Sequence, residues 1–410
     1  MLLDMTVSNF RSIKSPQTIT FEAVRDNRLS ESKVVKVSEK LKVIKTSAII
    51  GPNGAGKSTF VRALEALKAI VTAEAEAANP LQLLAGTSFA YSEVKGGPAN
   101  MVVELVMGTD EESNEAMVGR YALVADRDRV YEESYHLIIG RSKKLMFERK
   151  LVDANAIELS YRYRWGKMFR GEKKRMVGKV SPKHTYLAAA ARKGSLTLMP
   201  LYQWFSERLL ILPFGLSSLS EKVLVDQLVK HPGWKKQLIN FLWSVDITDI
   251  RELRVQDDKL IFIHTNVTQH YACYFANESL SLRRLASIAV AMFESFVSPR
   301  CLVIDDFGML LHPYALEHMV AIFEKSNADI GSQILAVDCN PTLLKDGLLR
   351  RDAVWFAQKD QESATVYYSL ADFKYSRSKE RTGQLYLNGS FGALPITSEF
   401  GFIDEEKKEL

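Results

Sequence analysis

The sequence predicts an α/β fold that is interrupted by an antiparallel β subdomain and a helical insertion. Strand and helix patterns alternate near both ends of the chain, whereas short strand-like runs and then helical spacings fill its middle. We expect five divisions: residues 1–78 and 251–400 as the two parts of the α/β unit, 79–165 as the β subdomain, 166–250 as a basic and helical insertion, and 401–410 as a charged tail.

The bulk composition is that of a folded protein without a membrane segment. The chain has 410 residues, of which 47% are hydrophobic and 25% charged, and its formal net charge is +5. Its cysteines, Cys273, Cys301 and Cys339, form no CxxC pair, which is typical of reduced thiols in a cytosolic protein. The start lacks a signal-peptide pattern, and no apolar run approaches the roughly 20 residues that a membrane helix needs. We therefore expect a cytoplasmic location and no membrane partner.

A glycine-rich turn between a strand and a helix predicts a phosphate site. The stretch "GPNGAGKST", residues 51–59, fits the pattern GxxxxGK[ST], follows an apolar strand and opens a helix. Glycines let such a loop wrap an anion, Lys57 reaches the β- and γ-phosphates, and the Ser58 hydroxyl binds Mg²⁺. The pattern therefore predicts ATP and Mg²⁺ as cofactors. The expected nucleotide ligands are Asn53, Gly54, Ala55, Gly56, Lys57, Ser58 and Thr59.

A second strand ends in two carboxylates. In "CLVIDDFGMLLHP", residues 301–313, four apolar residues run into Asp305 and Asp306. We expect Asp305 to hold Mg²⁺ opposite Ser58, and Asp306 to polarise the attacking water. Taken alone, such a run can also be an ordinary strand that ends in a turn. The presence of the phosphate-loop pattern in the same sequence favours the interpretation as a metal site. Nucleotide-hydrolysing enzymes with such a strand usually carry Glu at the second position, and Asp is one methylene shorter. A catalytic base that lies about 1 Å too far from the water can lose on the order of a hundredfold in rate.

The middle of the chain is basic. Residues 141–193 contain 16 Lys and Arg against four acids, a difference of +12, with aromatic residues in between. Three interpretations stay open: a nucleic-acid surface, a docking site for an acidic protein, and a solvated basic face. Residues 196–212 and 222–245 carry apolar residues at helical spacing, and we assign both predicted helices to the core rather than to an oligomer interface.

The order of these motifs resembles that of ABC-type ATPases of the SMC and OLD class. More narrowly, the chain is similar to AAA-labelled ATP-binding proteins of bacterial anti-phage and abortive-infection systems. The similar stretches are "SNFRSIK", "LMPLYQWFSERLLIL", "LHP" after the acidic strand, "RRDAVWFAQKD", "YSLADFK" and "GQLYLNGSFGALP". They span nearly the whole chain, and the C-terminal set is the most diagnostic. The resemblance implies an ABC/SMC-type P-loop ATPase head.

The resemblance also implies that two heads close face to face on two ATP molecules, as a homodimer or higher oligomer. The signature segment would be "NESLSLRR", residues 277–284, whose Ser279 would touch the γ-phosphate held by the other head. The chain departs from the family where Asp306 replaces Glu, Ser281 replaces Gly, Cys339 replaces His, and "FGML" follows the acidic strand. Because the binding elements are kept and the hydrolytic ones altered, we expect clamped assemblies with slow or absent hydrolysis. The rival hypothesis is that Asp306 still works as the base.

The expected function is that of an ATP-binding sensor or scaffold subunit of a bacterial anti-phage defence system, controlling a separate effector protein. No second catalytic set is visible in the sequence, which motivates an effector elsewhere. One alternative is an SMC-like DNA-repair ATPase that binds DNA in an ATP-dependent manner, which the lack of a sustained heptad run weakens. Another is an ATP-dependent nuclease, although no acidic nuclease set follows the ATPase part.

Overall fold

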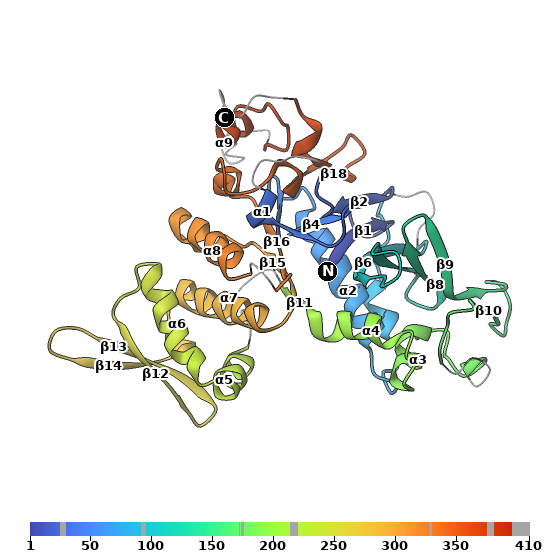
Figure 1. Cartoon of the computed structure of the whole chain (residues 1–410), viewed down its shortest axis with the longest axis horizontal. Coiled ribbons are helices and arrows are strands. Elements are labelled where there is room, and N and C mark those ends of the chain that lie inside the picture. Colours follow the sequence, from blue (N-terminus) through green and yellow to red (C-terminus); the bar gives the residue numbers. More distant parts are fainter. Residues whose placement is uncertain are drawn as a thin grey trace, which may run out of the picture.

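A mixed six-stranded sheet lies at the centre of the computed structural model, which describes residues 1–24, 30–91, 96–171, 173, 176–213, 220–327, 330–374 and 381–395 (Figure 1). Its strand order is β11-β15-β16-β5-β17-β18, and every pair is parallel except β17 with β18. The strands are β5 (Thr46–Ile50), β11 (Leu209–Leu212), β15 (Cys301–Asp305), β16 (Gln333–Asp338), β17 (Val354–Lys359) and β18 (Thr365–Ser369). The expected tail 401–410 lies outside the described residues.

Both faces of this sheet are covered, so its parallel strands are apolar on both sides. Helix α2 (Lys57–Thr72) packs on one face, and α7 (Leu280–Val297) and α8 (Pro313–Ser326) pack on the other (Figure 1). Alternate residues divide between two cores: Ile49 joins the core with α2, and Ile50 joins the core with α7 and α8. The period of two in each strand therefore produces the layers directly.

A seven-stranded antiparallel sheet lies beyond α2, in the order β10-β9-β8-β7-β6-β1-β2. Its strands are β1 (Leu2–Ser8), β2 (Gln17–Thr20), β6 (Ala99–Thr109), β7 (Ala116–Ala125), β8 (Val130–Ile139), β9 (Ser142–Leu151) and β10 (Tyr161–Trp165). The meander from β6 to β10 falls within the division expected at 79–165. The first two strands of the chain extend the same sheet, because β1 pairs with β6 with Met5 opposite Val103.

The segment expected as one helical insertion, 166–250, is shared between the two cores. Helix α3 (Tyr186–Arg192), α4 (Met199–Gln203) and the π-helical turn η3 (Trp204–Arg208) pack in the core with α2. Helices α5 (Glu221–Lys230) and α6 (Gly233–Ser244) pack in the other core.

The predicted single helix over 196–212 is wrong. Residues Leu209–Leu212 form β11, which pairs in parallel with β15 at the edge of the central sheet. A short apolar run such as "LLIL" fits a buried strand as well as a helix, and only its neighbour in the sheet decides between them.

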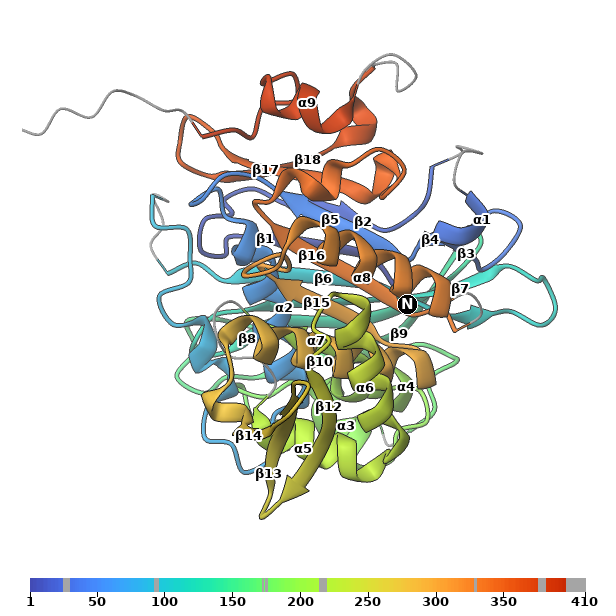
Figure 2. The same cartoon turned by 90° about the vertical axis from the view of Figure 1, so that its left-hand side faces the viewer.

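The three-stranded sheet of β12 (Ile250–Gln256), β13 (Lys259–Thr265) and β14 (His270–Tyr274) extends away from the central sheet beside α5 and α6 (Figure 2). None of the helices in the described part of the chain is long and apolar enough to cross a membrane. The remaining elements are α1 (Ser30–Lys33), β3 (Val34–Lys36), β4 (Lys42–Ile44), α9 (Thr382–Leu387) and the short 3-10 turns η1 (Pro80–Leu84), η4 (Phe275–Asn277), η5 (Pro341–Leu344), η6 (Arg351–Ala353) and η7 (Leu370–Asp372).

A buried pair of charges fastens α3 to the antiparallel sheet. Glu133 and Arg149 are both 0% exposed and lie 3.9 Å apart. Glu133 accepts the backbone N–H groups of Tyr186 and Leu187 at 2.6 and 2.8 Å, which satisfies the start of α3. Arg149 donates to the carbonyl of His184 at 2.6 Å. The pair therefore joins the β subdomain to the segment that leads into β11.

We expect the substitution Glu133→Ala to destabilise the protein by about 3–5 kcal/mol, because it leaves the Arg149 charge buried without its partner. The free energy of unfolding in urea measures this loss. The matched control is Glu132→Ala on the same strand, where a 39% exposed side chain pairs with Lys150 and should contribute less than about 1 kcal/mol. Equal losses in the two variants would contradict this assignment.

Candidate functional site

The glycine-rich loop connects the end of β5 to the start of α2, as the phosphate-binding pattern requires. Gly56 has a φ of 97°, and a Cβ there would lie 2.0 Å from the hydroxyl oxygen of Thr365. A Cβ on Gly51 would lie 2.3 Å from the carbonyl oxygen of Ala357. Both positions therefore need glycine, because β17 and β18 press against the loop from behind.

A set of hydroxyl groups supports the loop from that side. The Thr365 hydroxyl lies 2.9 Å from the carbonyl oxygen of Ala55 and 2.8 Å from the Ser12 hydroxyl. Ser12 in turn lies 2.9 Å from the Thr59 hydroxyl, and Tyr367 donates to the carbonyl of Gly56 at 2.8 Å. Ser12 belongs to the "SNFRSIK" stretch, so this N-terminal segment and strand β18 meet behind the phosphate loop.

The ammonium group of Lys57 lies inside the loop. It donates to the carbonyl oxygens of Gly51 at 2.9 Å and Pro52 at 3.0 Å, and the residue is 6% exposed. The loop and Asp306 line one cavity of about 360 Å³. Its described lining residues are Ser12, Asn53, Gly54, Gly56, Lys57, Ser58, Thr59, Asp306 and Lys359. Ala55, the remaining predicted loop residue, is buried beneath it.

Ser58 and Asp305 come together beside this loop. The Ser58 hydroxyl donates to Oδ1 of Asp305 at 3.1 Å. Asp305 is 0% exposed, and its Oδ2 has no hydrogen-bond partner among the described residues. Burial raises the pKa of the Asp305 carboxyl, against the hydrogen bond from Ser58, which lowers it.

This pair of groups fits a magnesium ion. A hydroxyl and a carboxylate oxygen are hard ligands of the kind that Mg²⁺ prefers, and a buried carboxylate oxygen without a partner is costly unless a cation balances it. Mg²⁺ is commonly bound by one or two protein groups together with substrate phosphates and water. Ser58 and Asp305 are therefore the residues that would hold it, and the nucleotide would complete its coordination.

Asp306 follows in a tight turn and faces the loop. Its φ is 50°, and burial, followed by the nearby charge of Asp338, raises the pKa of its carboxyl. Two residues that the sequence analysis did not single out hold this turn. Arg284 donates to the carbonyl oxygens of Asp305 and Asp306 at 2.7 and 2.5 Å, and Asp338 accepts the N–H of Gly308 at 2.5 Å.

The predicted signature serine lies elsewhere. Ser279 caps the start of α7 by accepting the N–H of Leu282 at 3.2 Å, and it is exposed. It does not line the described cavity at the phosphate loop of its own chain. Cys339, which stands where the family has His, is also exposed and follows β16.

A histidine connects the signature segment to the three-stranded sheet. His264 of β13 contacts Asp249 at 2.6 Å through Nδ1 and Glu278 at 2.7 Å through Nε2. Its ring also lies beside Tyr271 of β14, 6.3 Å between centroids. Burial lowers the pKa of His264, but the hydrogen bonds to Asp249 and Glu278 outweigh it, so the net pKa is raised. Glu278 directly precedes Ser279, so the contact with His264 fixes the start of the signature helix.

The aromatic residues of the basic segment 141–193 are buried or half-buried. On β10, Tyr163 and Trp165 stack with ring centroids 5.6 Å apart, and the Trp165 indole donates to the Tyr186 hydroxyl at 3.0 Å. The alternate residue Arg164 is exposed and pairs with Glu148 at 3.3 Å. Stacking on one another and packing against the core therefore occupy part of the surface that bases would need. Glu172, Lys174 and Arg175 lie outside the described residues.

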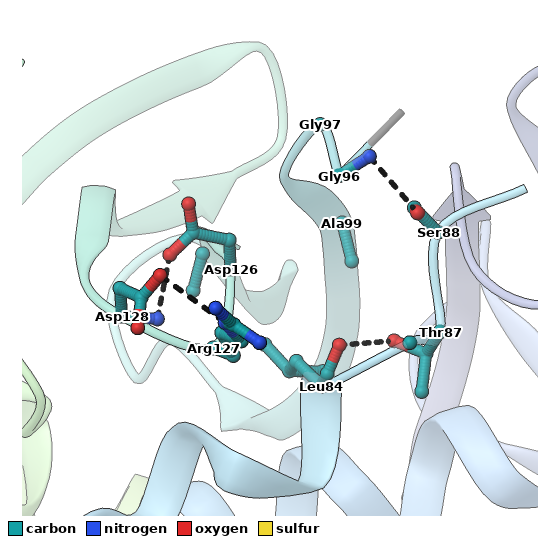
Figure 3. A pocket seen from close by; sticks show the side chains of 11 residues that line it. Leu84, Thr87, Ser88, Gly96, Gly97, Ala99, Asp126, Arg127 and Asp128 are labelled. Atoms are coloured by element: carbon teal, nitrogen blue, oxygen red, sulfur yellow. Dashed lines mark hydrogen bonds and ion pairs between the residues drawn. The ribbon is translucent and has the colours of Figure 1, made fainter. Parts of the chain in front are cut away.

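A separate cavity of about 350 Å³ lies between the segment before β6 and the β7–β8 turn (Figure 3). The Asp126 carboxylate there accepts the backbone N–H groups of Asp128 and Arg129 at 2.8 and 2.9 Å and the Tyr131 hydroxyl at 2.7 Å. The hydrogen-bonding capacity of this carboxylate is therefore used by groups of its own turn and of Tyr131. The described lining of this cavity shares no residue with the cavity at the phosphate loop.

Comparison with known proteins adds solved structures only. No family model matches the sequence, and no curated protein matches it. The SMC head domain from Thermotoga maritima is 13% identical, with a TM-score of 0.42 over 90% of this chain and 98% of that chain. An SmcHead bound to the C-winged helix domain of ScpA is 12% identical, with a TM-score of 0.49 over 92% and 99% of the two chains. An Smc head with an extended coiled coil, bound to the C-terminal domain of ScpA derived from Pyrococcus furiosus, is 9% identical, with a TM-score of 0.44 over 95% and 99%.

Because these similarities are remote, the fold class is assigned from the chain's own sheet order and from its glycine-rich loop. The chain is an α/β protein in which an antiparallel β subdomain and a helical segment separate the strand before the glycine-rich loop from the carboxylate strand. The fold class predicted from the sequence is confirmed.

We expect His264 to make stability depend on pH. Its raised pKa means that its contribution is complete below the unfolded-state pKa of about 6.5 and is lost as the pH rises through the higher folded-state value. The free energy of unfolding of the wild type should exceed that of His264→Gln by about 1 kcal/mol just below the unfolded-state pKa, where Asp249 and Glu278 are still ionised, and this difference should shrink as the pH rises through the higher folded-state pKa. The control is His318→Gln, a substitution of an exposed histidine on α8. A difference that stays constant with pH would contradict the assignment.

Proposed function

We propose that this chain binds Mg²⁺-ATP and acts as an ATP-clamped sensor or scaffold subunit of a bacterial anti-phage defence system. The observation that carries the nucleotide site is the contact of Ser58 with the buried Asp305 beside the glycine-rich loop. Together with Lys57, these groups supply a cation for the phosphates, a hydroxyl and a carboxylate for the metal, and backbone N–H groups at the start of α2.

Association of two heads is supported by the position of the signature segment. Ser279 is exposed and lies outside the cavity of its own chain, and the neighbouring Leu280 is 41% exposed. A segment that binds phosphate only in a partner has to be open to solvent in the single chain. The proposed assembly is therefore a homodimer or higher oligomer in which Ser279 of each chain faces the nucleotide of the other.

Slow hydrolysis is supported by the geometry of Asp306. Its backbone turn is held by Arg284 and Asp338, so the short side chain cannot approach the phosphates by a shift of the chain alone. A base that is displaced by about 1 Å loses on the order of a hundredfold in rate. The bound triphosphate would then persist and keep the assembly closed.

The anti-phage role and the separate effector rest on the resemblance of the sequence motifs. An assembly that stays closed while ATP is bound suits a scaffold that holds an effector and releases or activates it on infection. Binding of nucleic acid through 141–193 is less favoured, because the aromatic residues of β10 pack inward and Arg164 and Lys150 are paired with carboxylates.

We expect Lys57→Ala to abolish ATP binding, because the triphosphate loses its main protein cation. Isothermal titration with Mg²⁺-ATP measures the binding, and light scattering with and without ATP measures the mass. The wild type should bind ATP and form a heavier assembly when ATP is present, whereas the variant should do neither.

The control for that experiment is Lys222→Ala, which removes an exposed lysine at the start of α5. In cells that carry the complete locus, Lys57→Ala should lose protection against phage in a plating assay and Lys222→Ala should keep it. Protection that survives Lys57→Ala would separate the defence role from ATP, and a wild type that fails to bind ATP would remove the whole proposal.

We expect wild-type turnover well below the roughly 10 per second that is common for enzymes. Asp306→Glu should raise this rate by about tenfold or more, because the longer side chain reaches the water, and Asp306→Asn should lower it while leaving ATP binding unchanged. Release of phosphate under saturating ATP measures all three. Turnover of several per second in the wild type, lost in Asp306→Asn, would instead make the chain a working ATPase.

A further inference from the structure

Charged residues of opposite sign lie on opposite sides of the phosphate loop. The strands β15, β16, β5 and β17 are neighbours and run in parallel, so their carboxyl ends meet at one edge (Figure 2). On one side of the loop that follows β5, this edge carries Asp305 at the end of β15 and Asp338 at the end of β16. On the other side it carries Lys359 at the end of β17.

Lys359 belongs to the cavity at the phosphate loop. Among its described lining residues it is the one lysine besides Lys57. Its ammonium group donates to the carbonyl oxygen of Ser363 at 2.8 Å, across the turn that joins β17 to β18. Lys359 is exposed, so its ammonium group can reach a ligand in this cavity, and partial burial lowers its pKa against the neighbouring charge of Asp360.

The hairpin that carries Lys359 is fixed to the loop. Lys359 lies opposite Thr365 in the β17–β18 register, and Thr365 contacts Ala55 and Ser12 behind the loop. A Cβ on Gly56 would collide with Thr365, which shows how closely the hairpin approaches. The position of Lys359 relative to the phosphate loop is therefore set by packing.

The direction of a bound nucleotide decides what Lys359 would touch. A magnesium ion held by Ser58 and Asp305 would keep the γ-phosphate end on the β15 and β16 side. The α-phosphate end would then lie on the opposite side of the cavity, where Thr59 and Lys359 are among its lining residues. We propose that Lys359 is a second cationic ligand of the nucleotide and binds its α-phosphate. This inference rests on the proposed binding of ATP.

A contact to the α-phosphate predicts an equal effect on the affinities for ATP and ADP, because both nucleotides carry that group. Loss of one charge-assisted hydrogen bond should weaken both nucleotides about tenfold to a hundredfold and by the same factor. The ratio of their affinities should stay that of the wild type. A lysine that bound the γ-phosphate instead would affect ATP alone.

The experiment is titration of the full chain with Mg²⁺-ATP and with Mg²⁺-ADP. The variants are Lys359→Met, which keeps the apolar stem, and Lys359→Arg, which keeps the charge and should bind nearly as well as the wild type. Thermal unfolding without nucleotide verifies that Lys359→Met is folded. The matched control is Lys14→Ala, which removes an exposed lysine that pairs with Glu362 of the same hairpin at 2.8 Å and does not line the cavity.

Equal weakening of ATP and ADP in Lys359→Met, with Lys14→Ala unchanged, is the expected result. Unchanged affinities in Lys359→Met would overturn the assignment of Lys359 while leaving the proposed ATP site in place, and so would weakening of ATP alone. A wild type that binds neither nucleotide would overturn both proposals at once.

Discussion

The site depends on one constraint, which is that the carboxyl ends of parallel strands meet at the same edge of a sheet. This constraint brings the Ser58 hydroxyl within 3.1 Å of Asp305, although 247 positions separate them in the sequence. It also explains why a carboxylate can be 0% exposed, since the strand that carries it is covered on both faces. The free energy cost of burying Asp305 is then offset by Ser58 and, in the proposed function, by a metal ion.

The long segment between the two motifs is tied back into the fold rather than appended to it. Its strand β6 pairs with β1, its helix α3 is held by Glu133, and its strand β11 joins the central sheet beside β15. The carboxylate strand is therefore flanked by β11 on one side and β16 on the other. The inserted segment therefore contacts the carboxylate strand directly through β11.

Local patterns carried much of what could be predicted, and long-range contacts account for the rest. The glycine-rich loop and the acidic strand are contiguous in sequence, so their residue types indicate their roles directly. Arg284 and Lys359 fall within quoted stretches, but their places in the site depend on groups from other elements. Arg284 binds the carbonyl groups of Asp305 and Asp306, and Asp338 accepts the N–H of Gly308, so residue type alone does not indicate these contacts. The strand β11 was mistaken for helix for the same reason, because its partner β15 lies some 90 residues further along.

Helix α7 links the two halves of the proposed mechanism within one rigid element. Its start is fixed by Ser279 and by the contact of Glu278 with His264, and one turn later Arg284 holds the carbonyl groups of Asp305 and Asp306. Both residues lie in the first turns of α7, where the regular helix geometry fixes their relative positions. The exposed signature and the carboxylate turn of the same chain are consequently set by a single position of α7, so contact of Ser279 with a partner's nucleotide would bear directly on the geometry around Asp306.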